Sequence, residues 1–264
     1  MKTGASLLIT LLCLTLYAHA QTLQRVNLHG RPADLNFAPG EENLESPLIV
    51  LLHGAYGNSI QFQFQSSVLR GTSEAGLRVA LLNGQAWSRP TQPGNRTWYG
   101  QMRSWNADWC CWLVAGDDLT YIETTISTLQ TGVSGNGNKV IAVGHSNGAM
   151  MAYYFMCQKP NVLHGVLGVS GLVSFERCQN SDTRVIHVHG DADTTVPITG
   201  DNNLSDGKQF QTLGQQWALF NNTEINDTTF IVERASHEID DIDRKLKAQF
   251  GFNLADLAIG LANY

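Results

Sequence analysis

The chain has 264 residues, of which 43% are hydrophobic and 15% are charged. This suits one domain with a large buried core, because single α/β domains commonly reach about 250 residues. With 17 basic and 23 acidic residues the net charge is −6, and the sequence has no basic stripe, which argues against nucleic acid as a partner.

The first twenty residues have the pattern of a secretory signal peptide. Lys2 precedes an apolar run over residues 7–16, which ends in the small-residue motif Ala18-His19-Ala20. The run is too short for a comfortable membrane span, and no later segment approaches about 18 consecutive apolar residues. We therefore expect a secreted mature chain over residues 21–264, extracellular or periplasmic, with no integral membrane segment.

An even number of cysteines in a chain bound for an oxidising compartment indicates disulfides. The mature chain carries Cys110, Cys111, Cys157 and Cys178. Among the possible pairings we favour Cys157 with Cys178, which closes a loop across one helix–strand unit and leaves Cys110 with Cys111. A metal site is the competing interpretation, but adjacent cysteines lack the two-residue gap that lets both sulfurs reach one ion.

In the N-terminal half, hydrophobic patterns predict strands interrupted by turns and a helix. Residues 24–37 alternate around a Gly-Arg-Pro turn and indicate a hairpin of two edge strands. Apolar runs at 47–52 and 77–82 are typical of strands buried on both faces of a parallel sheet. A turn at 53–58 precedes a segment to residue 70 that we expect to be helical.

Residues 83–112 have no clear period and carry five of the six tryptophans. So long a connection in a compact domain is usually functional or disordered, and its aromatic and cysteine content is not that of a disordered segment. The tryptophans either pack as a local hydrophobic cap or line an acyl or aromatic pocket, and the sequence leaves both possibilities open.

In the C-terminal half, predicted strands continue to alternate with predicted helices. Asp117 or Asp118 caps a helix whose apolar residues recur at helical spacing. Further strands are expected at 139–145, 166–169, 184–189 and 228–232, and helices at 149–155, 208–220 and from 240 to the C-terminus. The pattern predicts an α/β fold with a mostly parallel central sheet and helices on both faces.

The motif Gly144-His-Ser146-Asn-Gly148 lies between a strand and a helix, which is the pattern of a nucleophile elbow. Side chains two positions before and after the serine would collide with neighbouring chain on so tight a turn, so both of these positions favour glycine. The helix N-terminus places the amide of Asn147 where an oxyanion would form, and the turn after His53 supplies the amide of Ala55 as the second donor. A glycine-rich turn without a catalytic role is the alternative.

Partners for Ser146 are expected in the order acid then histidine, each after a later strand. His237 is the only histidine downstream of Asp191 and Asp193. We choose Asp193 as the acid because the Val-Pro that follows can bury its carboxylate, whereas Asp191 suits a turn residue that satisfies local amides.

Two other patterns receive less weight. His187 and His189 alternate on one strand face and could form a metal pair, but no third ligand has a supporting spacing, so we expect neither a metal nor another cofactor. Four glycosylation motifs, which matter only in a eukaryotic host, begin at Asn95, Asn203, Asn221 and Asn226.

Four blocks of sequence carry a family resemblance: residues 51–54, residues 104–111 with the pair Asp117-Asp118, residues 144–150, and residues 189–197. With them the chain resembles the secreted polyhydroxybutyrate depolymerase and feruloyl esterase family of α/β-hydrolases. The resemblance covers residues 47 to about 237 and implies an α/β-hydrolase fold, ester substrates, and a triad of Ser146, Asp193 and His237. We expect a single catalytic domain of this fold over 21–264. Trp112 and the pair Glu238-Ile239 depart from the family pattern, which bears on substrate choice more than on the triad.

Members of that family cleave either hydroxyacid polyesters or the acyl decorations of plant cell-wall polysaccharides. We expect a secreted serine carboxylic-ester hydrolase that removes feruloyl or acetyl groups from plant polysaccharide. A polyhydroxybutyrate depolymerase acting on polyester or its oligomers is the second candidate, although the chain has no room for an appended polymer-binding module. The third is an inactive hydrolase fold retained as a secreted binding protein.

Overall fold

The computed structural model describes residues 23–38, 44–86, 96–97, 100–108, 116–178, 183–200, 210–220 and 228–264. The expected signal peptide, Cys110, Cys111 and the asparagines of all four glycosylation motifs lie outside these ranges. So do four of the five tryptophans of the 83–112 segment; Trp105 is the one that is described.

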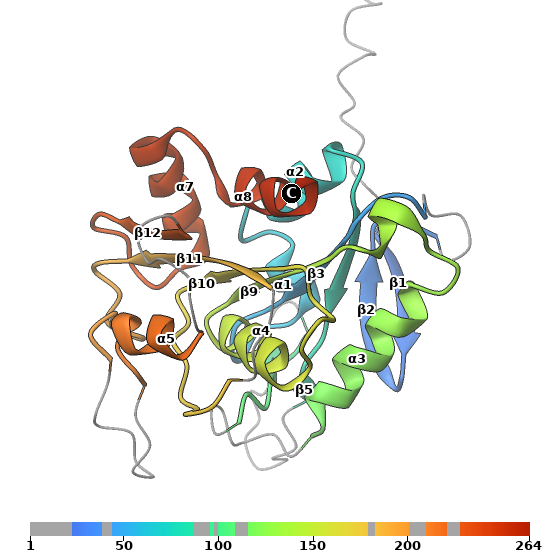
Figure 1. Ribbon diagram of the computed structural model, residues 1–264, viewed down its shortest axis with the longest axis horizontal. Helices are drawn as coiled ribbons and strands as arrows, with labels where there is room; N and C mark the ends of the chain where they lie inside the picture. Colours follow the sequence, from blue (N-terminus) through green and yellow to red (C-terminus); the bar gives the residue numbers. More distant parts are fainter. Residues whose placement is uncertain are drawn as a thin grey trace, which may run out of the picture.

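An eight-stranded sheet forms the centre of the molecule (Figure 1), in the order β1-β2-β4-β3-β9-β10-β11-β12. Its strands are β1 (Gln24–Leu28), β2 (Arg31–Leu35), β3 (Leu48–Leu52), β4 (Arg78–Leu82), β9 (Val140–His145), β10 (Gly165–Val169), β11 (Arg184–Gly190) and β12 (Thr229–Val232). The β1–β2 and β2–β4 pairs are antiparallel and the other five are parallel. The mostly parallel sheet is confirmed, but only β1 of the hairpin lies at an edge, because β2 pairs with β4.

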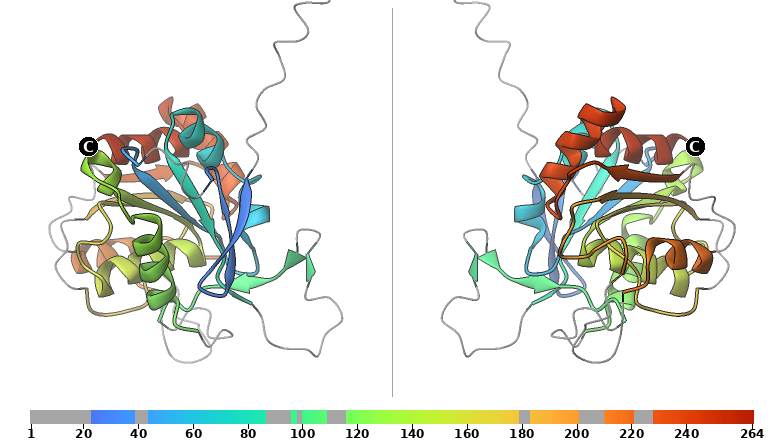
Figure 2. Two further views of the ribbon diagram at one scale, coloured as in Figure 1. Left: turned by 90° about the vertical axis from the view of Figure 1, so that its right-hand side faces the viewer. Right: turned by 90° about the vertical axis from the view of Figure 1, so that its left-hand side faces the viewer.

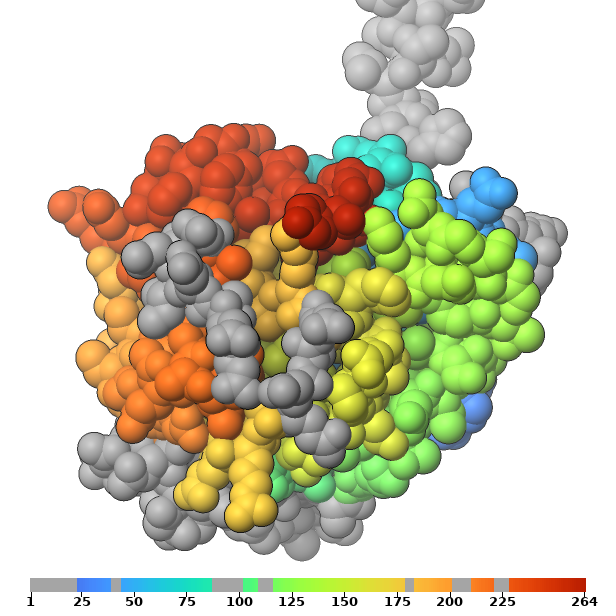
Figure 3. All heavy atoms as spheres, viewed as in Figure 1, coloured from blue at the N-terminus to red at the C-terminus, as the bar shows by residue number. Residues whose placement is uncertain are grey.

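Helices cover both faces of the sheet (Figures 1 and 2). One face carries α2 (Val68–Glu74), α7 (Ile239–Phe250) and α8 (Leu254–Asn263), and the other carries α3 (Asp118–Leu129), α4 (Asn147–Gln158) and α5 (Leu213–Leu219). In the space-filling view, α7 and α8 (red) lie along the top of the molecule, with α3 (green) and α5 (orange) below them (Figure 3). Each helical layer closes its own hydrophobic core against the sheet.

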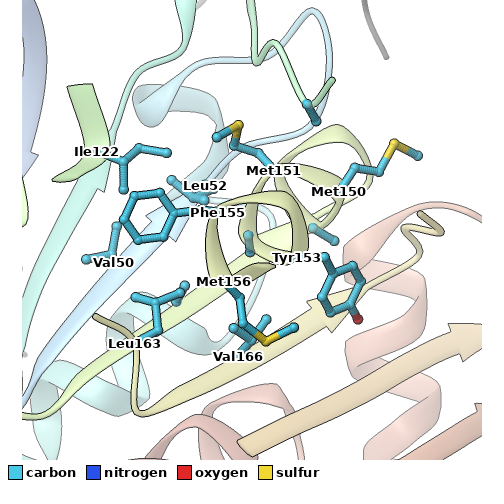
Figure 4. Packing of buried hydrophobic residues seen from close by; sticks show 14 of the residues in the cluster. Val50, Leu52, Ile122, Met150, Met151, Tyr153, Phe155, Met156, Leu163 and Val166 are labelled. Atoms are coloured by element: carbon cyan, nitrogen blue, oxygen red, sulfur yellow. The ribbon is translucent and has the colours of Figure 1, made fainter. Parts of the chain in front are cut away.

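The helix α4 lies at the centre of the larger core. Ten of its 12 residues are buried, so it is apolar on nearly every side, as expected of a helix enclosed by other elements. Phe155 packs among Val50 and Leu52 of β3 and Ile122 of α3 (Figure 4). The disulfide between Cys157 and Cys178, the pairing we favoured, ties the last turn of α4 to the segment after β10.

Three predicted helices differ from those observed. The segment up to residue 70 is two helices, α1 (Ser59–Phe62) and α2, because the amide of Ser67 bonds to the carboxylate of Asp243 in α7 at 2.6 Å rather than continuing the helix. The C-terminal helix is divided at Gly251, whose φ of +85° ends α7. The helix expected from residue 208 begins only at Leu213, after the capping box of Thr212.

The segment after β4 contains two small ribbons in its described part. β5 (Gln85–Ala86) pairs with β8 (Arg103–Ser104), and β6 (Arg96–Thr97) pairs with β7 (Gly100–Gln101). The β6–β7 ribbon projects away from the body of the molecule (Figure 2). A 3-10 helix (Gly135–Asn138) precedes β9. No helix among the described residues is both long and apolar enough to span a membrane.

Candidate active site

The turn between β9 and α4 holds Ser146 in an unusual backbone conformation, with φ +53° and ψ −121°. Crowding explains its flanking glycines. A Cβ on Gly144 would lie 2.3 Å from the carbonyl oxygen of Gly148, and one on Gly148 would lie 2.1 Å from that of Leu52. Both contacts are with backbone, which cannot swing aside, so the elbow requires glycine at each position.

The three residues expected to act together meet at the carboxyl ends of three parallel strands of the sheet. Ser146 follows β9, Asp193 follows β11 and His237 follows β12. Nε2 of His237 lies 2.8 Å from the hydroxyl oxygen of Ser146, and its Nδ1 lies 2.8 Å from Oδ2 of Asp193. Because Nδ1 faces a carboxylate it carries the proton, which leaves Nε2 to accept the hydrogen bond that the serine hydroxyl donates.

The carboxylate of Asp193 is buried and its oxygens are surrounded by donors. Oδ1 accepts the amides of Thr195 at 2.9 Å and Val196 at 2.8 Å, while Oδ2 faces His237 and also Nε2 of His189 at 3.1 Å. Burial by itself raises the pKa of Asp193, but the hydrogen bonds from His189, His237 and Val196 outweigh it and hold the pKa below its usual range. The carboxyl group is therefore ionised at neutral pH.

Asp191, the rejected acid, lies in a different environment. It is exposed, and its Oδ1 accepts the backbone amide of Arg234 at 2.5 Å. It thus satisfies an amide across the loop that leads to His237, in keeping with the turn role expected from the sequence.

The loop after β3 reaches the serine. A Cβ built on Gly54 would lie 3.4 Å from the Cβ of Ser146, and Ala55 is the next residue. Asn147 occupies the first position of α4. The two residues expected to supply oxyanion amides thus come from two elements next to Ser146, Ala55 from the loop after β3 and Asn147 from the N-terminus of α4.

Buried side chains that the sequence left unassigned hold this loop. His53 donates from Nδ1 to the carbonyl of Gly54 at 2.7 Å and accepts the amide of Gly84 at Nε2, 3.1 Å away. Burial lowers the pKa of His53 to about 4, so the ring is neutral. Trp105 donates from Nε1 to the carbonyl of His53 at 2.9 Å, and both polar atoms of the Asn147 side chain bond to the backbone of Trp105.

Trp105 therefore packs beneath the active-site loops instead of lining a pocket. Its side chain is fully buried, and its ring lies against His53 and Tyr121. In the sequence, Trp105 was marked only by its place in the block 104–111. Its contact with the loop some fifty residues earlier could not be predicted, because no periodic pattern connects the two segments.

The histidine pair considered for metal is instead part of a hydrogen-bonded chain. Nε2 of His187 lies 2.9 Å from Nδ1 of His189, and both rings are fully buried. Within the described ranges, no group of three or more His, Cys, Asp or Glu side chains is arranged to hold a metal ion.

The mostly parallel sheet and the serine turn at the end of its central strand define the α/β-hydrolase fold. Within that class, the sequence profile of the Phospholipase/Carboxylesterase family matches residues 39–209, and the chain belongs to this family. This match shows the Phospholipase/Carboxylesterase family and does not single out the depolymerase and feruloyl esterase group that the four sequence blocks resemble.

Individual relatives are distant. "Putative esterase NocK" of Nocardia uniformis subsp. tsuyamanensis is 26% identical over 173 residues, which are 63% of this chain and 46% of that protein. The chain thus spans less than half the length of this relative.

Solved structures agree in fold. An acetyl xylan esterase from Aspergillus awamori has a TM-score of 0.57 at 16% identity, covering 88% of this chain and 99% of its own. An S-formylglutathione hydrolase from Agrobacterium tumefaciens has a TM-score of 0.57 at 12% identity, covering 91% and 94%. At such identities the likeness concerns the fold alone.

Proposed function

We propose that the protein is a serine carboxylic-ester hydrolase in which Ser146 is the nucleophile, His237 the general base and acid, and Asp193 the acid that orients His237. The observation that carries the proposal is the unbroken contact from hydroxyl to imidazole to buried carboxylate, at 2.8 Å and 2.8 Å. Strain at Ser146 adds support, because unfavourable backbone conformations persist where the surrounding structure imposes them, commonly at active sites.

The proposed proton transfers follow the two contacts of His237. Nε2 of His237 takes the proton of Ser146 as the hydroxyl oxygen attacks the ester carbonyl, and returns it to the departing alcohol. Asp193 stays ionised and stabilises the imidazolium that forms in between. Water then repeats the sequence on the acyl-enzyme and releases the acid. The amides of Ala55 and Asn147 hold the oxyanion in both halves of the reaction.

For the substrate we propose feruloyl or acetyl esters of plant cell-wall polysaccharide. Support comes from the blocks at 104–111 and 189–197, which resemble enzymes acting on such esters or on hydroxyacid polyesters. Trp105, which belongs to the first block, lies close to the proposed site. Its Nε1 donates to the carbonyl of His53, and His53 begins the loop that carries Ala55. Hydroxybutyrate oligomers are the competing substrate class.

We also propose that the chain is secreted. Residues 1–20 have the pattern of a cleavable signal, and the Cys157–Cys178 disulfide suits an oxidising compartment. N-terminal sequencing of protein recovered from culture medium or periplasm tests this, and an N-terminus at Gln21 is expected. Recovery only from the cytosol with residues 1–20 retained would overturn it.

The decisive experiment compares the wild-type protein with Ser146→Ala on methyl ferulate, acetylated xylan, a 4-nitrophenyl ester and hydroxybutyrate oligomers. Turnover that vanishes in a folded Ser146→Ala variant supports the mechanism, and the ranking identifies the acyl group. If kcat/KM is highest on the hydroxybutyrate oligomers, these oligomers replace polysaccharide esters as the proposed substrate. Activity retained by Ser146→Ala would overturn the assignment of the nucleophile. A wild-type protein that neither turns over an ester nor reacts with a fluorophosphonate would contradict the esterase proposal and support the candidate of an inactive hydrolase fold that binds a partner.

A further inference from the structure

The acid of the proposed triad is connected to a second set of buried polar side chains on its far side. Nε2 of His189 lies 3.1 Å from Oδ2 of Asp193 and 2.7 Å from the carbonyl oxygen of Val196. Nδ1 of His189 lies 2.9 Å from Nε2 of His187, whose Nδ1 lies 2.6 Å from the hydroxyl of Tyr153. The two histidines and the tyrosine are all fully buried, and the proposed catalytic step uses none of them.

The proton positions in this chain follow from its end at Asp193. A carbonyl and a carboxylate can only accept, so Nε2 of His189 carries a proton and a neutral ring accepts at Nδ1. His187 must then donate from Nε2 and accept at Nδ1, which makes the hydroxyl of Tyr153 a donor. Every hydrogen bond from Tyr153 to His189 therefore points toward Asp193.

The protonation states of the two outer residues agree with this direction. Burial lowers the pKa of His187 well below its ordinary value, so its ring is neutral. Burial raises the pKa of Tyr153 above that of a free phenol, so its hydroxyl keeps the proton that it donates. The two outer residues are thus uncharged.

The fold makes room for this connection. Figure 4 shows the ring of Tyr153 leaving α4 toward the strands, with the hydroxyl at its far end. It passes over β10 at Gly168, where a Cβ would lie only 1.9 Å from the tyrosine oxygen. Gly168 pairs in register with His187. Any larger residue at 168 would keep the hydroxyl from reaching the histidine.

We propose that Tyr153, His187 and His189 are positioning residues that hold Asp193, and through it His237, in the orientation needed for proton transfer with Ser146. This inference rests on the proposed function. The amides of Thr195 and Val196 fix Oδ1. The Nε2–H of His189 is shared between the carbonyl of Val196 at 2.7 Å and Oδ2 at 3.1 Å, and Oδ2 also accepts the Nδ1–H of His237. With donors on both oxygens the carboxylate cannot rotate, and a misplaced base costs rate steeply.

The test is a matched pair at His189. His189→Gln places an amide N–H near the position of Nε2, whereas His189→Met has a similar length without a donor. For His189→Met we expect kcat to fall about tenfold to a hundredfold with KM within about twofold, and for His189→Gln we expect most of kcat to be kept. Equal losses in both variants, or none in His189→Met, would overturn the proposal.

A readout that needs no turnover separates this proposal from the esterase assignment. In protein labelled with ¹⁵N-histidine, wild type and His189→Gln should show His237 protonated at Nδ1 with a low-field proton signal, and His189→Met should lose or broaden that signal. An unchanged signal in His189→Met would contradict the positioning role even if no ester is hydrolysed. Should His189→Met fail to fold, Tyr153→Phe removes one hydroxyl at the far end, and an unchanged His237 signal together with unchanged kcat would overturn the proposal.

Discussion

The imidazole of His145 donates from Nε2 to the backbone carbonyl oxygen of His237 at 2.8 Å. The residue just before the elbow serine therefore holds the loop that carries the proposed base, and the two rings lie 5.1 Å apart. His145 is buried, and burial together with the nearby His237 lowers its pKa to about 4, so the donor is a neutral ring.

Removing this donor should affect catalysis and stability together. In His145→Leu the carbonyl of His237 loses its partner, which we expect to lower the free energy of unfolding by about 1–3 kcal/mol and kcat by about tenfold. His145→Gln, which can still donate, should lose less of both. Urea unfolding and ester kinetics measure the two effects, and a leucine variant as active as wild type would contradict the role.

Asp193 and Asp191 should differ sharply in their effect on rate. Asp193→Asn exchanges a charged acceptor for an amide between two histidines, and we expect kcat to fall by on the order of 10⁴-fold. Asp191→Asn should cost less than about tenfold, because its exposed carboxylate bonds only one backbone amide among the contacts described here. Parallel kinetics on one ester decide between them, and the reverse ranking would move the acid to Asp191.

The elbow glycines should be far less tolerant than a glycine in an open position. In Gly148→Ala the new Cβ would lie 2.1 Å from the carbonyl oxygen of Leu52, so we expect a loss of about 3 kcal/mol or more, or no folded protein. Gly260→Ala is the matched control, since nothing lies within 4 Å of its Cβ position in α8. It should gain about 0.5–1 kcal/mol. Thermal unfolding compares them, and similar melting temperatures would refute the steric argument.

Breaking the disulfide should lower stability without stopping catalysis. Cys157 and Cys178 are 21 residues apart, and closing a loop of that size stabilises a protein by about 3 kcal/mol in the chain-entropy account. We expect Cys157→Ser with Cys178→Ser to lower the melting temperature and leave kcat near wild type. A double variant as stable as the oxidised wild-type protein would show that the bridge contributes little.

Stability should fall on mild acidification. Burial lowers the pKa values of His53 and His145 from 6.5 to about 4, so between these pH values the unfolded chain binds protons that the folded protein does not. The contribution of the two neutral rings to the free energy of unfolding is complete above pH 6.5 and is lost progressively toward pH 4. It amounts to on the order of 3 kcal/mol for each ring. His187 acts in the same direction.

Urea unfolding at pH 7, 6, 5 and 4.5 measures this loss. The His145→Gln variant should show a shallower dependence on pH, because one of the buried rings is gone. A free energy of unfolding that stays constant from pH 7 to 4.5 in wild type would show that these histidines are not held neutral. Asp193 does not contribute in this window, since its lowered pKa matters only below about pH 3.8.

The sequence by itself determined what depends on neighbouring residues. Apolar runs at 47–52, 77–82 and 139–145 indicated buried strands because a strand covered on both faces needs apolar side chains at every position. The elbow could be recognised because its tight turn requires glycine two positions before and two positions after the serine. The order of Ser146, Asp193 and His237 followed from strands that all end at one edge of the sheet.

Only the tertiary structure decided what depends on distant contacts. The helix break at Ser67 comes from Asp243, which lies 176 residues away in the chain. The supporting roles of His145, Trp105 and the Tyr153–His187–His189 chain have no local signature, because a buried histidine that accepts and donates looks in sequence like any other. Hydrogen bonds between side chains are set by positions in space. Here the close packing of helices and strands brings those side chains into contact with one another and with the residues that carry or adjoin the site: Asn147, Asp193 and His237.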